Sequence, residues 1–414
     1  MTRVTRAQAQ RRRAFAAFSF ITVIGLAVIL WPKTSSERVV GEPTATSAIT
    51  PSAAPPTGSA PPDAVPAWLA WMPGGFPESF PARIGSADGI TRDVVVEGDT
   101  LWMTESHDDT GALVDRPPLP YEIPIDAFAV DPGEYAPFLP ADERDAIVRA
   151  LRDGEAVLGE SSAKLRRIGV GGSMSFGSDT VTVGAIAPDD AVGWSELLVN
   201  RDIGRQLGIE HERYLLAFAD DTMSLRRFTD DVRALIPADS PLRTVEPGGT
   251  RHVRVASGVN PPIVFKEVFG EFDAYPRSDD PVYLNIDPAW YHSHIQTRTV
   301  PIFHDPVTCN GALFPMLIGA LKDVQAAGLA GEIHTYSGCY APRTVARSPI
   351  APPSNHAYGA AIDINAPENP FGGTPTMDPR IVRIFQRWGF VWGGRFLIPD
   401  GMHFEYGSPP SAGV

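Results

Sequence analysis

The sequence predicts an α+β protein built from two folded blocks that follow an apolar segment and a proline-rich linker. Its 414 residues are long for one domain and sufficient for two, and 43% of them are hydrophobic, so a sizeable core can form. Runs with the alternation of β-strands are interspersed with runs in which apolar residues recur every three or four positions. The formal net charge of −14 argues against a nucleic-acid partner.

The first 32 residues predict a membrane anchor. Residues 1–13 hold five arginines and no acidic residue, and residues 14–31 carry no charge. An anchor over residues 14–32 is at the short end of what spans a hydrocarbon core of about 30 Å, and the positive-inside rule keeps residues 1–13 in the cytoplasm. No convincing cleavage site follows, so an uncleaved single-pass anchor is favoured over a removed signal peptide. The sequence therefore predicts a cell-membrane protein whose C-terminal part is extracytoplasmic.

Residues 33–66 predict a linker. Within them, residues 41–66 are rich in Pro, Ala, Ser and Thr and almost uncharged. Such a composition buries too little apolar surface to fold, so we expect a semi-extended tether between the anchor and the folded blocks. An inert stalk is the alternative interpretation.

Residues 67–240 predict a small α+β accessory domain without a catalytic constellation. A β-like run over residues 88–106 is bounded by Asp-Gly and Gly-Asp turn signals, and residues 173–188 alternate like a hairpin. Helical spacing begins near residue 140, after Leu-Pro, and a second short helix is expected over residues 194–209. The pattern of this block resembles periplasmic domains of bacterial export and permease systems.

Residues 255–408 predict a second, single α+β domain. An amphipathic helix is expected over residues 310–329 and another over residues 379–389, the second with a proline near its start. The strand candidates are EIHTYSG at 332–338, GAAIDIN at 359–365, FVWGG at 390–394 and MHFEYG at 402–407.

The chain has two cysteines, Cys309 and Cys339, both in the part expected to be exported. In an oxidising compartment a lone pair of this kind usually forms a disulfide. Closing a loop of this length would contribute about 3–4 kcal/mol on the chain-entropy model. A cysteine-ligated zinc is the rival interpretation, and the absence of CxxC spacing argues against it.

Two short stretches concentrate residues that bind metals. The stretch SNHAYGAAIDIN at 354–365 contains His356 and Asp363 with Gly359 between them, and PDGMHFEYG contains Asp400 and His403. Two imidazoles and one carboxylate form a three-ligand zinc set with an open position, and zinc would compensate a carboxylate that lies in an apolar run. Asp400 could then act as a general base on a water at the open position. On spacing alone, a solvated His356 and a His403 bonded to a neighbour remain alternatives.

Taken together, the two stretches resemble the zinc peptidoglycan peptidases. This family includes VanY-type D-alanyl-D-alanine carboxypeptidases and phage L-alanyl-D-glutamate endopeptidases, and it shares its fold with the hedgehog signalling domain. The resemblance covers about residues 255–408 and implies a hedgehog/DD-peptidase-like zinc domain there. Residues 67–240 lie outside it.

The resemblance also implies residue roles. His356, Asp363 and His403 would bind Zn²⁺, and Asp400 would be the catalytic base. The family's substrate-binding arginine, which also polarises the scissile carbonyl, corresponds to Arg343. Two expectations remain: Ser354 matches the motif serine, as a substrate contact or a support of the ligands, and Trp392, if it is not a core residue, could pack on peptide stems.

The resemblance therefore implies a membrane-anchored zinc metallopeptidase that hydrolyses peptidoglycan stem peptides. The choice between a D-Ala-D-Ala carboxypeptidase and an L-Ala-D-Glu endopeptidase stays open, since Asp400 stands where VanY-type enzymes usually carry glutamate. Cys339, near the arginine, also departs from the family pattern. A non-catalytic zinc module that binds the cell wall or a partner protein is the alternative. A third hypothesis makes residues 67–240 a scaffold for division or export machinery.

The remaining histidines are weaker candidates. His292 and His294 form an HxH pair that could face a metal together on a strand, although no acidic partner follows at a useful spacing. His304 and His334 could line a groove but are more simply structural. His211 is expected on the surface of the accessory block, beside solvated glutamates.

Overall fold

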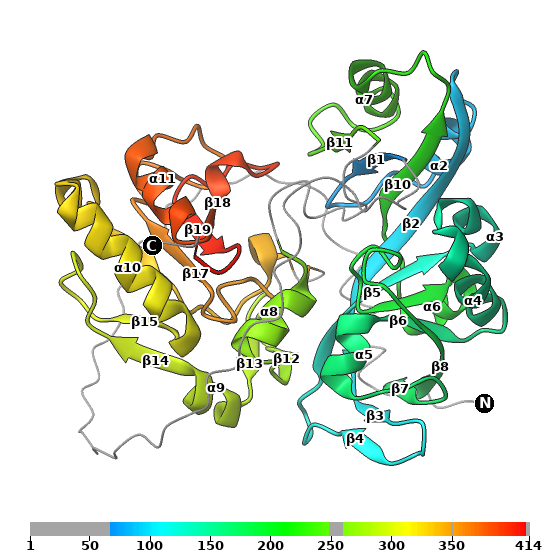
Figure 1. Ribbon diagram of the computed structural model, residues 1–414, viewed down its shortest axis with the longest axis horizontal. Helices are drawn as coiled ribbons and strands as arrows, with labels where there is room; N and C mark the ends of the chain where they lie inside the picture. Colours follow the sequence, from blue (N-terminus) through cyan, green and yellow to red (C-terminus); the bar gives the residue numbers. More distant parts are fainter. Residues whose placement is uncertain (1–66, 248–259, 349–350, 411–414) are drawn as a thin grey trace. The chain divides into compact units, whose positions relative to one another are not determined.

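The computed structural model describes residues 67–247, 260–348 and 351–410 (Figure 1). The expected basic tail (1–13), anchor (14–32) and linker (33–66) lie outside the described residues. Among the described helices, none combines the length and apolarity needed to cross a bilayer. The mixed α and β content that the sequence predicts is present in both blocks.

An eleven-stranded sheet runs through the first block, in the order β11-β1-β10-β2-β5-β9-β6-β8-β7-β3-β4. The pairs β5–β9 and β6–β8 are parallel, and the other pairs are antiparallel. The strands are β1 Trp68–Trp71, β2 Ile90–Met103, β3 Glu105–His107, β4 Leu113–Asp115, β5 Ile123–Val130, β6 Ala156–Gly159, β7 Ser173–Phe176, β8 Asp179–Ala187, β9 Leu197–Asn200, β10 Glu212–Ala219 and β11 Arg243–Val245.

Alternate residues of the central strands enter two different cores. Phe128 of β5 and Val157 of β6 pack with the helix α4, whereas Ala127 and Leu158 pack with α5 and α6 on the other face. This is the two-residue period of a strand, here with both faces covered. The helices of the block are α2 Phe80–Ile84, α3 Pro132–Tyr135, α4 Ala141–Arg152, α5 Glu160–Arg166, α6 Arg201–Leu207 and α7 Leu225–Arg233.

Two local predictions for this block were wrong. The Gly98–Asp99 pair does not form a turn, because β2 continues through it and Asp99 accepts a hydrogen bond from Arg213 of β10. Residues 194–209 are not one helix, since they form strand β9 followed by α6. The expected helix near residue 140 and the hairpin over 173–188 are confirmed as α4 and β7–β8.

The second block is built around a four-stranded antiparallel sheet in the order β16-β17-β19-β18. Two further strand pairs, β12–β13 and β14–β15, lie in the same block. Its strands are β12 Ala274–Pro276, β13 Leu284–Ile286, β14 Ile295–Arg298, β15 Val307–Asn310, β16 Tyr336–Gly338, β17 Ala361–Ile364, β18 Phe390–Trp392 and β19 His403–Tyr406. Its helices are α8 Pro262–Phe269, α9 Pro288–His294, α10 Phe314–Ala326 and α11 Pro379–Arg387.

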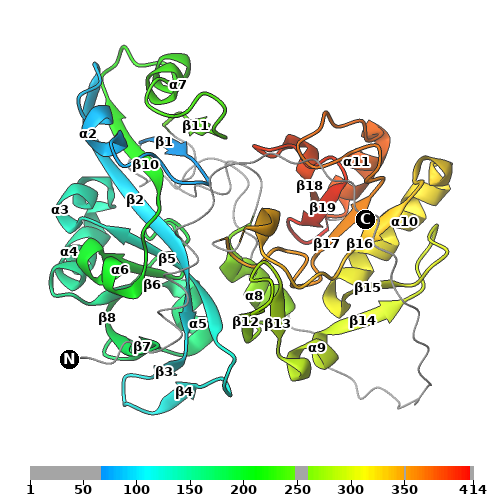
Figure 2. The same ribbon diagram turned by 180° about the vertical axis from the view of Figure 1, so that it is seen from behind.

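Helices α10 and α11 pack beside one another in both views (Figures 1 and 2). A side chain on Gly319 of α10 would meet the ring of Trp388 within 2.5 Å, so this glycine lets the two elements approach. The expected helix over 310–329 begins later than its periodicity suggests, because residue 310 still pairs in β15 and α10 starts at Phe314.

The predicted disulfide between Cys309 and Cys339 is confirmed. Their Cα atoms lie 5.4 Å apart, and both side chains are buried. The bond links the end of β15 to the residue that follows β16, and it therefore ties the strand pair β14–β15 to the four-stranded sheet.

A buried ion cluster connects α5, the residues before β9, and α8. Glu196 Oε2 lies 2.8 Å from both Arg166 Nη2 and Lys266 Nζ, and Glu271 contacts the same two cations. The side chains of Arg166, Lys266 and Glu196 are at most 1% exposed. Buried charges of this kind persist only when every member has a partner, so the four residues form one interdependent unit.

Candidate metal centre

Two neighbouring strands of the second block carry the first pair of predicted ligands. β17 and β19 are antiparallel neighbours, and Asp363 lies directly opposite His403 in the register. Side chains of directly opposed residues project to the same face of a sheet. The third predicted ligand, His356, comes from the loop that leads into β17.

The structure brings the three side chains together. Nε2 of His356 lies 3.1 Å from Nδ1 of His403 and 3.2 Å from Oδ2 of Asp363, and His403 Nδ1 lies 3.1 Å from Asp363 Oδ1. The three ligand atoms are all within 4.8 Å of one another, and this is the only group of such residues in the described segments that could hold a metal ion. Two imidazole nitrogens and a carboxylate that converge in a buried space fit the donor set of zinc.

Each histidine also has a partner for its other ring nitrogen. Nδ1 of His356 lies 2.8 Å from the carbonyl oxygen of Cys339, and Nε2 of His403 lies 2.9 Å from Oε2 of Glu405. When these nitrogens donate, the lone pairs of His356 Nε2 and His403 Nδ1 point at the shared space. The two tautomers that a metal requires are therefore those that the surrounding residues favour.

Glu405 is a functional candidate that the sequence analysis missed. It is 2% exposed, and its Oε2 also accepts a hydrogen bond from Nδ2 of Asn355 at 2.6 Å. The available signal was its position two residues after His403 in the same strand, since such residues share a face of the sheet.

Gly359 gives the ligand loop its path. Its φ of +64° is in the left-handed region, and a Cβ there would lie 2.5 Å from the backbone nitrogen of Asn310. That nitrogen donates to the Gly359 carbonyl at 3.0 Å. The backbone therefore both turns at this glycine and approaches the neighbouring strand β15 closely.

The site favours positive charge. Burial acts to raise the pKa of Asp363, but His356 and His403 outweigh it and hold this pKa far below its usual range. Burial acts to lower the pKa of His403, but its hydrogen bonds to Asp363 and Glu405 raise that pKa to about 10. Carboxylates that favour positive charge on the neighbouring imidazoles also favour a bound cation at this place.

Asp400 lies in the turn that enters β19. Its backbone N–H donates to the carbonyl of Gly393 at 2.8 Å, and its carbonyl accepts from the N–H of His403 at 3.2 Å. Its Oδ1 is buried without a hydrogen-bond partner. Burial raises the pKa of Asp400, while the charges of His403 and Arg343, among others, oppose that rise. A carboxylate oxygen without a partner beside a metal-ligand set can accept a proton from a substrate or a water.

Arg343 lies near these carboxylates without forming an ion pair with any described residue. Its Nη1 donates to the carbonyl of Thr344 at 3.3 Å. Burial lowers its pKa, and the charges of Asp363 and Asp400 act against that change. Most of its donors have no partner among the described residues, and a half-buried guanidinium of this kind can bind an anionic group of a ligand.

The side chains of Ser354 and Trp392 form hydrogen bonds with backbone groups at or next to the site residues. Ser354 is buried, its Oγ accepts from the N–H of His356 at 3.3 Å, and its own N–H donates to the Arg343 carbonyl at 2.9 Å. Trp392 donates from Nε1 to the carbonyl of Gly401 at 2.9 Å, next to Asp400. Contacts of either residue with substrate stay predictions.

The other candidate histidines, all within the described residues, do not join the metal-ligand set. His292 and His294 lie on the helix α9 rather than on a strand, so these two side chains point to different sides and do not face one metal together. His211 is not simply solvated, because its Nδ1 lies 2.9 Å from Asp99 Oδ1. His334 pairs with Glu368 at 3.1 Å, and His304 is exposed.

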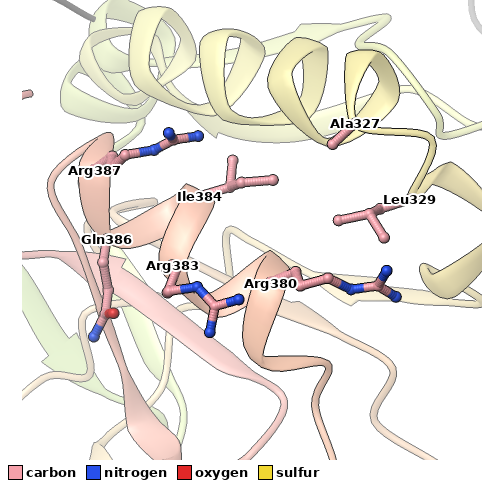
Figure 3. A pocket seen from close by; sticks show the side chains of 7 residues that line it. All are labelled: Ala327, Leu329, Arg380, Arg383, Ile384, Gln386 and Arg387. Carbon is pink, nitrogen blue, oxygen red and sulfur yellow. The ribbon is translucent and has the colours of Figure 1, made fainter.

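A pocket of about 650 Å³, separate from the metal-ligand set, lies between the end of α10 and the outer face of α11 (Figure 3). Ile384 and Leu329 form its apolar floor, and three arginine side chains surround them. The lining residues are Ala327, Leu329, Arg380, Arg383, Ile384, Gln386 and Arg387. None of them is a predicted site residue, and Arg380 is neutralised by Asp378 at 2.6 Å.

Comparison with known proteins places the metal-ligand set in a peptidase context. The profile of an M15 peptidase family, described as D-alanyl-D-alanine carboxypeptidase, matches residues 350–406, which include all three ligands and Asp400. Over this short segment the chain is similar to D-alanyl-D-alanine carboxypeptidases. Among curated proteins, none matches the chain.

Three solved structures show a distant similarity. The periplasmic region of MacB from Actinobacillus actinomycetemcomitans shares 9% identity, covering 44% of this chain and 88% of that chain, with a TM-score of 0.30. The extracellular domain of the noncanonic ABC-type transporter YknZ from Gram-positive bacteria shares 11% identity, covering 44% and 100%, with a TM-score of 0.30. A domain of a putative permease protein from Porphyromonas gingivalis shares 14% identity, covering 45% and 92%, with a TM-score of 0.28. Similarities of this size do not establish a shared fold.

Proposed function

We propose that the protein is a zinc metallopeptidase that hydrolyses peptidoglycan stem peptides. The observation that carries the proposal is the convergence of His356, Asp363 and His403 within 4.8 Å, in a segment that matches a peptidase family. The proposal includes a hedgehog/DD-peptidase-like domain over residues 255–408, an accessory domain over 67–240, and a single-pass anchor that leaves both outside the cytoplasm.

The residues have distinct roles in this proposal. His356 Nε2, His403 Nδ1 and the Asp363 carboxylate hold the ion, and bound zinc would supply a Lewis acid that makes a water more acidic. Asp400 takes a proton from the attacking water and later gives it to the leaving amine. Arg343 binds a substrate carboxylate or the oxyanion that develops on the scissile carbonyl. The unpaired Oδ1 of Asp400 supports its role as the proton acceptor.

The test is incubation of the purified full chain with muropeptides, with and without chelator, followed by mass spectrometry. We expect loss of D-alanine or cleavage between L-alanine and D-glutamate, abolished by chelator and restored by zinc. Asp400→Asn should lower kcat by at least about 100-fold while zinc content is unchanged. Full activity of Asp400→Asn would remove this residue as the base.

The alternative is a zinc module that binds wall peptides without cleaving them. The free donors of Arg343 fit this function too, whereas a buried carboxylate oxygen without a partner is a cost that binding alone does not require. Calorimetry with a stem peptide beside the turnover assay separates the two. Tight binding with no product would favour the module.

A further inference from the structure

The three predicted zinc ligands are held in two different ways. Asp363 and His403 are fixed by the register of β17 against β19, in which they lie directly opposite each other. His356 lies in the loop that precedes β17 rather than in a strand. The position of this third ligand therefore depends on the contacts that the loop makes.

The contacts of this loop lead to the disulfide between Cys309 and Cys339. The carbonyl oxygen of Cys339 lies 2.8 Å from Nδ1 of His356. At the other cysteine, the N–H of Asn310 donates to the carbonyl of Gly359 at 3.0 Å, and the N–H of Gly359 donates to the carbonyl of His356 at 3.0 Å. Together with the disulfide, these contacts close a ring that contains His356.

The disulfide joins a strand to a residue outside the strands. Cys309 lies in β15 and pairs with Gln296 of β14, whereas Cys339 follows the last residue of β16. Next to the disulfide, the N–H of Tyr340 donates to the carbonyl of Thr308 at 3.0 Å. A segment at the end of a strand opens locally at a lower free energy than the whole fold, and a covalent bond to a neighbouring strand restricts this opening. The disulfide therefore holds the Cys339 carbonyl beside the ring of the ligand histidine.

We propose that the disulfide positions the metal centre, because it keeps the Cys339 carbonyl in place for Nδ1 of His356. The inference rests on the zinc site of the proposed function and adds its regulation, since zinc affinity then depends on the oxidation state of two buried cysteines. With the disulfide open, His356 occupies the ligand position for only a fraction of the time, and the apparent zinc affinity falls by that fraction. The chain therefore holds zinc firmly only after the disulfide has formed.

The first test measures the zinc affinity of the full chain by competition with a chromophoric chelator. Cys309→Ala/Cys339→Ala should bind zinc about 10- to 100-fold more weakly than the wild type, the usual loss when the partner of a metal-binding histidine is removed. The matched control is Leu215→Ala, which removes a buried side chain of β10 in a core of the first block. This control loses stability but should bind zinc as the wild type does.

Cobalt(II) in place of zinc shows which ligand is affected, because its visible spectrum reports the ligands and their geometry. The spectrum of cobalt-loaded Cys309→Ala/Cys339→Ala should shift towards that of His356→Ala, since both have lost the same imidazole from the ion. Leu215→Ala should keep the wild-type spectrum. A general loss of stability would not produce this difference.

Reduction of the wild-type chain tests the same link without a substitution. A trialkylphosphine converts the disulfide into two thiols and becomes the phosphine oxide, with oxygen from water. Zinc bound before this treatment should pass to the chelator about tenfold faster than zinc bound to the oxidised chain. Mass spectrometry after alkylation confirms the open form, and circular dichroism confirms that it is folded. Equal zinc affinity and equal release in the open and closed forms would overturn the inference.

These outcomes are separate from those of the proposed function, because none of them depends on hydrolysis of a peptide. Weaker zinc binding by the open form, without cleavage of muropeptides by the oxidised chain, would reject the peptidase proposal and leave this inference standing. Full peptidase activity with equal zinc affinity in both forms would do the reverse.

Discussion

Glu405 lies against the outer ring nitrogen of His403, with Oε2 2.9 Å from Nε2, while the inner nitrogen Nδ1 faces Asp363. The carboxylate is itself fixed by Asn355, and its Oε1 is buried without a partner. A negative group at this position fixes the tautomer of the imidazole and makes Nδ1 a stronger ligand. Glu405 is therefore a positioning residue for the metal centre.

Glu405→Gln should weaken zinc binding by about 10- to 100-fold. The amide can still accept from His403, so the fold is retained, but the charge that strengthens Nδ1 is lost. Competition with a chromophoric chelator measures the zinc affinity directly, without relying on activity. Glu368→Gln, which removes a half-exposed partner of His334, is the control and should bind zinc as the wild type does. Equal affinity for Glu405→Gln would show that this carboxylate does not act on the metal.

Gly359→Ala should displace the ligand loop. Its new Cβ would lie 2.5 Å from the Asn310 backbone nitrogen, an atom that β15 holds in place. Gly328 has a similar positive φ of +71° but no atom within 4 Å of a Cβ, so Gly328→Ala is a matched control. We expect Gly328→Ala to cost about 1–2 kcal/mol for the left-handed backbone alone.

The difference in free energy of unfolding between the two variants measures the cost of the close contact with the Asn310 backbone nitrogen. Gly359→Ala should lower the free energy of unfolding by clearly more than Gly328→Ala, and its zinc stoichiometry should fall below one per chain. Urea titration and metal analysis of the purified variants measure both quantities. Equal losses in the two variants would mean that the loop can move away from Asn310 without cost.

Local sequence patterns predicted the local elements of the second block. The metal-ligand residues and the disulfide came from short motifs and from the cysteine count, and strands β17 and β19 came from β-branched and aromatic runs. The predictions failed where a distant partner decides the conformation. Asp99 looked like a turn residue because its compensating partner, Arg213, is 114 residues away in the chain. No local pattern contains that information.

Glu405 was missed for a related reason. The spacing of two residues puts Glu405 on the same face of β19 as His403, but its burial and its contact with the ring depend on the register of β17 against β19. His292 and His294 were misplaced despite a usable signal, since Asp287 followed by Pro288 is a typical helix start and Asp287 does cap α9. The expected separate domains of residues 67–240 and 255–408 stay a prediction.

Lys266→Met should destabilise the protein strongly. Its ammonium group contacts Glu196 and Glu271 at 2.8 Å and also the carbonyl of Pro124, all in a buried environment. Removing the cation leaves the two carboxylates with one guanidinium between them, a loss of about 3 kcal/mol or more. Urea unfolding of Lys266→Met beside Lys322→Met, at an exposed position, measures the effect. A loss below about 1 kcal/mol would show that Arg166 alone compensates both carboxylates.

Asp273→Asn should stabilise the protein, and more so at neutral than at acid pH. Burial, together with the charges of Glu271, Asp287 and Asp115, raises the pKa of Asp273 from 3.8 to about 6. Between these two values the folded state keeps a proton that the unfolded state has lost, so the contribution of Asp273 to stability falls as the pH rises through this window. The amide of the Asp273→Asn variant cannot ionise, so the variant does not lose this part of the free energy of unfolding as the pH rises. The gain at neutral pH is about 1 kcal/mol, because partial exposure of the side chain weakens the effect. Urea midpoints at pH 4.5 and 7.5 measure the change.

The control is Asp279→Asn. A hydrogen bond to Arg277 lowers the carboxyl pKa of Asp279, so the expected effect has the opposite sign and this variant loses stability at neutral pH. If Asp273→Asn is equally stabilising at both pH values, ionisation of this carboxyl is not what costs the fold its stability.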